Sequence, residues 1–381
     1  MKLAILLPGG VDRGGVDRVI HSRLWLLERL ARRHQVHVYA MRQEPEPGDW
    51  ELVGARVHNV GERGARRLRL FARFAAEHRA APFDVIHAFF GGLGTYAALL
   101  GWRHRVPVLY HPSGGEMVAL DDIGYGMRRS ARGRLALRVA FAGARRVTVA
   151  SAFMRELAAG HGVDAERVAI GVALDHWPAA APRPRDPARP ARLLHVGDVR
   201  PVKDQATLLS AAARLLHAGV RFELDLAGLD TMNGALQRSA DARRLSAVTR
   251  WHGVLRRDAL RALVDRADVL LMTSRHEAGP LAVLEAAVAG VPTVGTAVGH
   301  VAEWAPEAAV AVPVGDAAAL ARETAALLAD EPRRLAVARA AQRLAVADDA
   351  DHTAARFEQI YEEMLVRRSS TSRRAPAVSL P

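Results

Sequence analysis

Two glutamates, Glu277 and Glu285, stand on either side of a Gly-Pro step in the stretch HEAGPLAVLEAAVAG, residues 276–290. This stretch directly follows the apolar run DVLLMTS at 268–274, which is typical of a buried strand. Glu277 therefore falls in a strand-to-helix loop, and Glu285 lies within the helix among Ala, Leu and Val. A carboxylate in such surroundings is costly unless it accepts strong hydrogen bonds, and the two hydroxyls of a ribose would supply them.

The start of this expected helix is suited to an anion. Pro280 fits the first helical position because its missing N–H would have no partner there. The amides of Gly279, Leu281 and Ala282 are then unpaired at the positive end of the helix dipole, which favours a phosphate. Either glutamate alone could be a solvent-facing or ordinary loop acid. The combination of strand, turn, helix and two acids favours a nucleotide site.

A lysine supplies the second signal. Of the 53 basic residues, only Lys2 and Lys203 are lysines. Lys203 lies in LLHVGDVRPVKDQATLLSAAARLL, residues 193–216, between an expected strand and an expected helix. In a chain that otherwise uses arginine, an internal lysine indicates a need for a compact point charge. The alternative is chance survival of one lysine.

Two segments of the N-terminal half also place chemistry after strands. Residues 8–24, PGGVDRGGVDRVIHSRL, indicate a strand end, a loop with Gly14 and Gly15, and a helix. The glycine spacing departs from G-x-G-x-x-G, so it is a weak dinucleotide signal, and a flexible turn is the alternative. In VPVLYHPSGGEM, residues 106–117, His111 follows a buried strand and is expected to point into a cleft. A structural histidine is the alternative there.

The spacing of Glu277 and Glu285 resembles the E-x7-E motif of retaining glycosyltransferases with the GT-B fold, in particular glycosyltransferase family 4 (group 1). The resemblance covers most of the chain and is densest at 193–316. It implies that Glu277 faces the donor sugar and that Glu285 holds the nucleotide ribose. It also implies front-face retention, in which the leaving phosphate assists the acceptor.

The lysine segment resembles the family element G-R-x-x-x-x-K-G, whose Arg and Lys neutralise the donor diphosphate. Lys203 matches by spacing from Gly197. The arginine position is Asp198 instead, and Arg200 is expected to take over its role. The resemblance therefore implies that Lys203, with Arg200, stabilises the charge of the leaving diphosphate.

Weaker matches complete the site that the resemblance implies. His111 would lie beside the donor sugar, and the amides of Gly14 and Gly15 would lie near the donor phosphates and the acceptor. The other matches are backbone positions for the nucleobase, an acid in a G-G-x-P-E-like segment and a P-x-G-D-like turn: Gly253 with Val254, Glu303, and residues 313–316.

Short apolar runs alternate with helical patterns along the whole chain, which predicts an α/β fold with parallel sheets covered on both faces. Strands are expected at 3–7, 36–40, 85–88, 106–110, 147–150, 192–196, 223–227, 269–273 and 292–296. Further helices are expected at 16–33, 204–218, 257–266 and 317–330.

A Pro-rich stretch near the middle of the chain is typical of an exposed, fairly stiff linker. It predicts two doubly wound, Rossmann-type domains in a GT-B-like pair facing a cleft, where ligands bind beyond the carboxyl ends of the strands. The expected units are an acceptor-side domain at 1–178, the linker at 179–191, a nucleotide-sugar domain at 192–350, a closing helix at 351–366 and a disordered tail at 367–381.

Composition limits the remaining possibilities. The chain has 381 residues, no cysteine and a formal charge of +12, so a thiol nucleophile, a thiolate zinc site and a disulfide framework are excluded. No apolar run is long enough to span a bilayer, and the start is too short for a signal peptide, so a cytoplasmic enzyme is expected. Arginine-rich segments at 62–80 and 128–146 could rest on the inner, anionic face of a membrane. Ordinary helices packed on the sheet are the alternative.

Metal chemistry is not indicated, because no H-E-x-x-H occurs and the Asp349–Asp351 pair is explained by helix capping. The sequence therefore predicts a metal-independent retaining transferase that needs no cofactor. Its partners would be a nucleotide-diphospho-sugar donor and a glycan, lipid-linked or small-molecule acceptor. A nucleotide-sugar epimerase of the same plan is one alternative. A basic nucleic-acid-binding protein is another, although the arginines are dispersed and no nucleic-acid motif is present.

Overall fold

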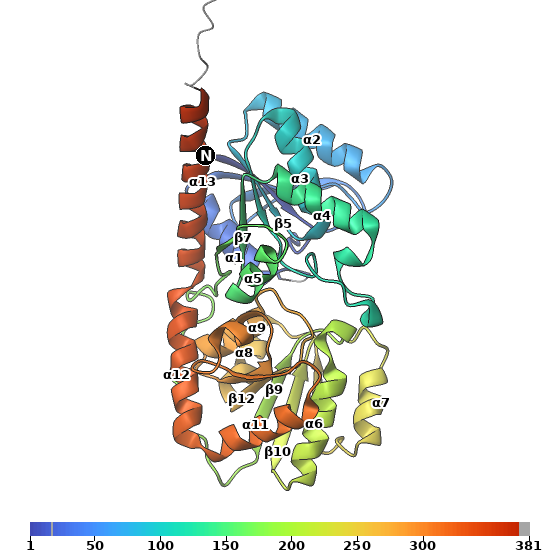
Figure 1. Cartoon of the computed structure of the whole chain (residues 1–381), viewed down its shortest axis with the longest axis vertical. Coiled ribbons are helices and arrows are strands. Elements are labelled where there is room, and N and C mark those ends of the chain that lie inside the picture. The colour runs from blue at the N-terminus through green and yellow to red at the C-terminus, as the bar shows by residue number, and fades with distance from the viewer. Residues whose placement is uncertain (17, 373–381) are drawn as a thin grey trace, which may run out of the picture.

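The computed structural model describes residues 1–16 and 18–372, which form two α/β domains stacked end to end (Figure 1). The N-terminal domain is built on an eight-stranded sheet of order β3-β4-β2-β1-β5-β6-β7-β8, parallel except for the antiparallel pair β3–β4. Its strands are β1 Lys2–Leu7, β2 Gln35–Ala40, β3 Gly48–Leu52, β4 Ala55–Asn59, β5 Val85–Phe89, β6 Val108–His111, β7 Arg146–Val149 and β8 Glu166–Arg167.

The C-terminal domain is built on a six-stranded parallel sheet of order β11-β10-β9-β12-β13-β14. Its central strands are buried on both faces because helices cover each side, which is why they are near-continuous apolar runs in the sequence. The strands are β9 Ala191–Val196, β10 Phe222–Ala227, β11 Thr249–Gly253, β12 Val269–Met272, β13 Thr293–Thr296 and β14 Val310–Val312.

Helices follow most strands and return the chain to the amino ends of the sheets. In the N-terminal domain they are α1 His21–Ala31, α2 Arg66–Ala80, α3 Gly91–His104, α4 Ala131–Gly143 and α5 Ala152–Ala159. In the C-terminal domain they are α6 Gln205–His217, α7 Ala235–Ala242, α8 Arg257–Arg266, α9 Leu281–Val288, α10 Gly299–Trp304 and α11 Ala317–Ala329. Short 3₁₀ turns occupy Asp121–Ile123, Met127–Arg129 and Pro201–Lys203.

Each sheet has a point at which the strand order reverses. In the N-terminal sheet the reversal falls between β1 and β5, and in the C-terminal sheet between β9 and β12. Loops after two such neighbouring strands diverge to opposite faces and leave a crevice, which is the usual ligand position in a doubly wound sheet.

The end of the chain ties the two domains together. Helix α12, Glu331–Ala347, runs along the C-terminal domain, and α13, Ala350–Ser372, continues along the N-terminal domain, as the orange and red helices of Figure 1 show. Phe357 and Tyr361 of α13 belong to the same buried cluster as Leu3 of the first strand. The last helix is therefore part of the N-terminal core.

The predicted fold, two doubly wound domains, is confirmed, and α8 has the bounds expected for it. Strands β3, β4, β8, β11 and β14 were missing from the prediction. All five lie at or next to a sheet edge. The sequence of β11, TRWHG, is polar because one side of an edge strand is solvated, whereas β14 is apolar but only three residues long.

Two boundaries differ from the sequence prediction. The first helix was expected from Val16 but begins at His21, because the amide of Ile20 donates to the carbonyl of Gly10 and closes a loop before it. Helix α13 continues to Ser372, so the first part of the predicted tail, 367–372, is helical. The remainder of that tail, 373–381, lies outside the described residues.

Candidate active site

A cavity of about 290 Å³ opens at the carboxyl ends of β9 and β12, on the two sides of the C-terminal switch point. His195 and Met272 line it from these strands, and α9 forms another wall. His21, the first residue of α1, reaches it from the N-terminal domain. A ligand in this cavity would therefore contact both domains. Six of the residues predicted for the site line it: Lys203, Glu277, Gly279, Leu281, Ala282 and Glu285.

Lys203 and Glu277 form an ion pair at the edge of this cavity. The Nζ of Lys203 donates to Oε1 of Glu277 over 2.6 Å, and the Oγ of Ser274 donates to the same oxygen over 2.6 Å. Burial alone would raise the pKa of Glu277, but the Lys203 charge and the two hydrogen bonds outweigh it and hold that pKa below its ordinary value. Glu277 is therefore ionised at neutral pH, and its charge positions the ammonium group.

Glu285 is in the opposite electrostatic situation. Its side chain is only 7% exposed, and no hydrogen bond from the described residues reaches its carboxylate. Burial raises the pKa of Glu285 to about 8. Its backbone carbonyl is fixed by the indole N–H of Trp177 over 2.9 Å, which holds this turn of α9 in place. A carboxyl group without partners on a cavity wall is available to a ligand with hydroxyl groups.

The start of α9 lies on the wall of the same cavity. Leu281 and Ala282 are its first two residues, whose amides have no acceptor inside the helix. A Cβ placed on Gly279 would lie 2.7 Å from the Cβ of Ala150, which belongs to the other domain. Glycine is therefore needed for the close approach of the two domains beside the start of α9.

A second cavity, of about 850 Å³, lies between the domains and shares His21 with the first. Gly15 lines it from the N-terminal domain, and Val254 lines it from the loop after β11. The amides of Gly14 and Gly15 are engaged inside their own loop, because they donate to the carboxylate and to the carbonyl of Asp12. The backbone of this loop thus lines the cleft, but its glycine amides are not directed at a ligand.

Two other positions predicted to bind the donor lie near these cavities without lining them. Arg200 is paired with the Asp198 carboxylate over 2.9 Å and stands on neither wall. Gly253 ends β11, and its carbonyl accepts from the amide of Gly228 over 2.8 Å. Gly253 positions Val254, whose side chain is 71% exposed at the cavity.

His111 is not where the sequence reasoning placed it. It ends β6 as expected, but the ring is fully buried against Phe89 and Phe357 instead of pointing into the cleft. Its Nδ1 contacts the Thr148 hydroxyl at 2.9 Å. Burial is the main reason that the pKa of His111 lies well below its ordinary value, with Arg23 adding to the effect. Helix α13 supplies Phe357 to this contact, and no local pattern around residue 111 could reveal that.

Glu303 joins the two domains and lines neither cavity. Its carboxylate accepts from the amide of Ala152 over 3.0 Å and from Nε of Arg167 over 2.5 Å, both in the N-terminal domain. Ser151 adds a hydrogen bond of 2.6 Å to the carbonyl of Ala278. This corner fixes the loop that carries Glu277. In the predicted turn at 313–316, Asp316 caps α11 through the amide of Ala319.

Sequence reasoning missed three residues that shape the site. Ser274 holds Glu277, and its only signal was a hydroxyl at the end of the strand before that acid. His21 was hidden by the wrong start of its helix. His276 bridges the cleft, with Nε2 at 3.0 Å from the carbonyl of Gly114. A contact across domains leaves no trace in sequence spacing.

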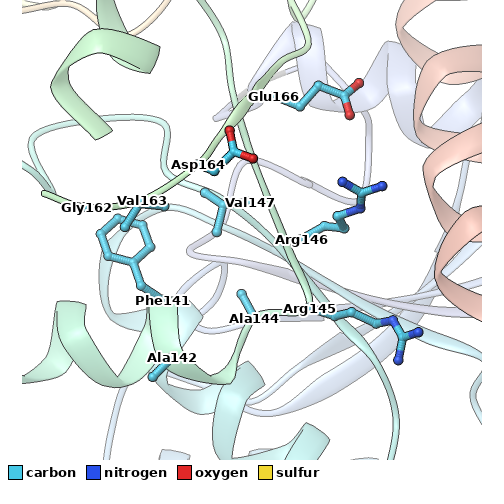
Figure 2. Close-up of a pocket in the computed structure, with 10 residues that line it drawn as sticks. All are labelled: Phe141, Ala142, Ala144, Arg145, Arg146, Val147, Gly162, Val163, Asp164 and Glu166. Carbon is cyan, nitrogen blue, oxygen red and sulfur yellow. The ribbon is translucent and has the colours of Figure 1, made fainter. Parts of the chain in front are cut away.

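A third cavity, of about 710 Å³, lies at the β7–β8 edge of the N-terminal sheet, beside the end of α4, and its lining residues are drawn in Figure 2. Figure 2 shows Arg145 and Arg146 extending away from Phe141 on the same side as Glu166. Arg146 pairs with Glu363 over 3.0 Å, and Arg356 pairs with Glu166 over 2.5 Å. These charges hold α13 against the sheet, so this cavity carries no comparable chemistry.

Known proteins share this architecture over nearly the whole chain. The sucrose-phosphate synthase of Thermosynechococcus elongatus has a TM-score of 0.80 at 18% identity, and the alignment covers 96% of this chain and 99% of that one. Anabaena HepE in complex with UDP-glucose has a TM-score of 0.74 at 16% identity, over 95% of this chain and 100% of that one. At such low identity the likeness shows the fold, which is that of a two-domain GT-B glycosyltransferase.

Sequence comparison identifies the family to which the chain belongs. The family "Glycosyl transferases group 1" matches residues 181–344, and the family "Glycosyl transferase 4-like domain" matches residues 14–173. The chain belongs to the group 1 glycosyltransferases. The glycogen synthase of Mycobacterium tuberculosis is 34% identical over 194 residues, which are 50% of this chain and 46% of that protein. The chain therefore spans about half the length of this relative.

Proposed function

We propose that this glycosyltransferase moves a sugar from a nucleotide-diphospho-sugar to an acceptor hydroxyl, with retention of configuration and without a metal ion. The main observation behind this proposal is that one cavity is lined by the Lys203–Glu277 pair, the start of α9 and the unpartnered carboxyl group of Glu285. A diphosphate suits the ammonium group and the helix start, and a ribose diol suits Glu285. HepE, which shares the fold, was solved with UDP-glucose, and this supports a donor of the same class.

In the proposed reaction the bond from the anomeric carbon to the β-phosphate oxygen breaks, and negative charge grows on that oxygen. Lys203 and the amides at the start of α9 stabilise this charge, which is strongest in the transition state. The acceptor oxygen bonds to the same face of the sugar, and its proton passes to the leaving phosphate. Glu277 positions Lys203 and faces the cationic sugar.

This scheme leaves no second carboxylate for a double displacement. Retaining hydrolases use two carboxyl groups on opposite faces of the sugar. In the present cavity, Glu285 is assigned to the ribose and Glu277 is engaged by Lys203. We therefore favour front-face retention over a covalent glycosyl-enzyme intermediate.

A nucleotide screen tests the proposed function. The purified protein would be heated with UDP, GDP or ADP and with the corresponding glucose or mannose donors, in the presence of EDTA. A nucleotide at 100 times its Kd adds about 2.7 kcal/mol of stability, so one base should raise the melting temperature clearly above the others. Stabilisation by none of them, or conversion of the donor to its epimer without acceptor, would contradict the proposal.

We further propose that the acceptor is lipid-linked and that the outer sides of α2, α3 and α4 rest on an anionic membrane. Their most exposed large apolar side chains are Leu68, Trp102 and Leu135, at 72%, 82% and 60% exposure. The helices lie side by side, because the rings of Phe74 and His104 approach to 5.2 Å and Thr95 bonds to Ala136. Exposed arginines lie on the same three helices: Arg67, Arg103, Arg132, Arg134 and Arg138.

An interfacial contact of this kind needs apolar insertion and charge together. Among the described residues, no helix has the length and apolar character needed to cross a bilayer. Each arginine near an anionic surface contributes about 1 kcal/mol, so binding should fall as salt rises.

Vesicle sedimentation tests the membrane contact. Vesicles containing phosphatidylglycerol should carry down the protein at low salt, and pure phosphatidylcholine vesicles should not. Trp102→Ser combined with Leu135→Ser should reduce binding, whereas the matched control Leu216→Ser, on the other domain, should not. Binding that ignores lipid charge, or equal binding of the two variants, would favour a soluble acceptor.

A further inference from the structure

A second cluster of chemically competent side chains lies inside the N-terminal domain, away from the two cleft cavities. His37 of β2 and His58 of β4 are each 2% exposed, and their rings stack with centroids 5.2 Å apart. Nδ1 of His37 lies 2.9 Å from Nε2 of His58. Glu77, from the last turn of α2, brings its Oε2 to 3.8 Å from Nδ1 of His37. None of the three residues lines a cleft cavity.

The carboxylate of Asp49 orients the ring of His58. Nδ1 of His58 lies 3.0 Å from Oδ1 of Asp49, on the neighbouring strand β3. A carboxylate at this position holds the proton on Nδ1 and turns the lone pair of Nε2 toward His37 and Glu77. Histidines that bind metals are commonly oriented by such an outer carboxylate. Arg73 in turn pairs with Asp49 and fixes it.

Both rings are held in the neutral form that a metal requires. Burial, together with the nearby His58 and Lys2, lowers the pKa of His37 to about 4. Burial also lowers the pKa of His58 despite its contact with Asp49. At neutral pH neither ring must lose a charge before it can act as a ligand.

We propose that His37 Nδ1, His58 Nε2 and Glu77 Oε2 form a structural site for a divalent transition metal of the zinc type. Imidazole and carboxylate are ligands that zinc accepts, at bond lengths of about 2.0–2.2 Å. Such bonds in a tetrahedron separate neighbouring ligand atoms by about 3.3 Å. The observed separations of 2.9 Å and 3.8 Å bracket this value, so small side-chain shifts complete the geometry. Water would supply a fourth ligand.

The protons balance without a redox step. Since the Nδ1–H of His58 donates to Asp49, Nε2 of His58 is unprotonated, and the proton between the two rings is carried by Nδ1 of His37. Metal binding replaces that hydrogen bond, and the proton of His37 moves to its Nε2. Glu77 contributes its existing negative charge.

Two cationic side chains lie close to the Glu77 carboxylate and would compete with a metal ion for it. Nζ of Lys2 lies 3.7 Å from Oε2, and Nη1 of the half-exposed Arg56 lies 3.6 Å from Oε1. Removal of Arg56 should therefore tighten metal binding, because Glu77 loses a competitor without loss of a ligand. A merely structural His–His–Glu network would not show this gain.

The other compact group of possible ligands among the described residues is Glu28, Asp175 and His176. Arg29 pairs with Asp175 over 2.7 Å and also approaches Glu28. With a buried arginine at its centre, that group is an ion-pair network and does not carry a similar argument.

The experiment is calorimetric titration of the untagged full-length protein with ZnCl2 after treatment with EDTA, with melting temperatures recorded in parallel. One equivalent of zinc should bind and raise the melting temperature. Asp49→Asn should weaken binding by roughly 10- to 100-fold, which is the usual effect of losing an outer carboxylate. Arg56→Gln should tighten it. The matched control is His217→Gln, an exposed histidine on the other domain, which should bind zinc as the wild type does.

A second, spectroscopic readout tests the metal ligands themselves. Co²⁺ bound to the wild-type protein should give the visible absorption of a tetrahedral nitrogen–oxygen site, and Glu77→Gln should alter that spectrum. Absence of one saturable zinc equivalent in the wild-type protein would overturn the proposal. Equal zinc affinities of the wild type, Asp49→Asn and Arg56→Gln would overturn it as well.

Discussion

The two domains differ in how many of their predicted site residues reach the cleft. In the C-terminal domain, Lys203, Glu277 and Glu285 meet in one cavity, together with the start of α9. In the N-terminal domain, the glycine amides of the first loop are engaged by Asp12, and His111 is enclosed by Phe89 and Phe357. The proposed donor site is built from strand-loop-helix units, so it could be predicted from local sequence. The N-terminal side of the cleft depends on long-range packing, so it could not.

Glu277 and Glu285 line the same cavity but lie in opposite electrostatic environments. Glu277 is stabilised as an anion by Lys203, whereas Glu285 is destabilised as an anion by burial alone. Pairs of titratable groups whose surroundings drive their pKa values apart are typical of binding and catalytic sites. The first group organises a cation, and the second is available to a ligand.

The largest effect is expected at Lys203. Lys203→Ala should lower kcat by on the order of 10²–10³-fold, because it removes a donor aimed at the charge of the leaving diphosphate. The affinity for the free nucleotide should fall much less. Arg214→Ala, an exposed residue on α6, is the matched control. A loss of substrate affinity with intact turnover would mean that Lys203 acts only in the ground state.

The next effect is a pH dependence of stability that originates at Glu285. Because its pKa in the folded protein is raised to about 8, its neutral form favours folding, and this contribution is lost as pH rises from the unfolded value through about 8. The wild type should lose on the order of 4 kcal/mol relative to Glu285→Gln across that window. Denaturant titrations at pH 5, 7 and 9 measure the difference. Parallel pH profiles of the two proteins would contradict the buried, unpartnered carboxyl group.

The smallest catalytic effect is expected at His111. His111→Gln disturbs a buried contact with Thr148 and should cost about 1–3 kcal/mol of stability. The KM for the donor and kcat should stay close to those of the wild type at temperatures where the variant is folded. A normal melting temperature with a large fall in kcat would show that the ring reaches the sugar after all.

The fold was predictable because most central strands of both sheets are apolar runs between helical patterns. The strand β11 was not, since TRWHG is polar at an edge where solvent replaces one neighbouring strand. In the site, Lys203, Glu277 and Glu285 could be predicted because each belongs to a strand-loop-helix segment of the sequence. The His37–His58–Glu77 cluster has no such signal, because its members lie on three elements that meet only in the folded domain.

The central claim is that Glu285 binds the ribose of a nucleotide in the cavity between the domains. Calorimetric titration with the nucleotide that stabilises the wild-type protein, compared with Glu285→Ala and the exposed control Glu307→Ala, tests it most directly. At pH 9, where Glu285 is ionised, the loss of a hydrogen bond to a charged group costs about 1.5–3 kcal/mol, so Glu285→Ala should weaken binding by roughly 10- to 100-fold. The control should bind as the wild type does. Equal affinity of Glu285→Ala and the wild type would contradict the account.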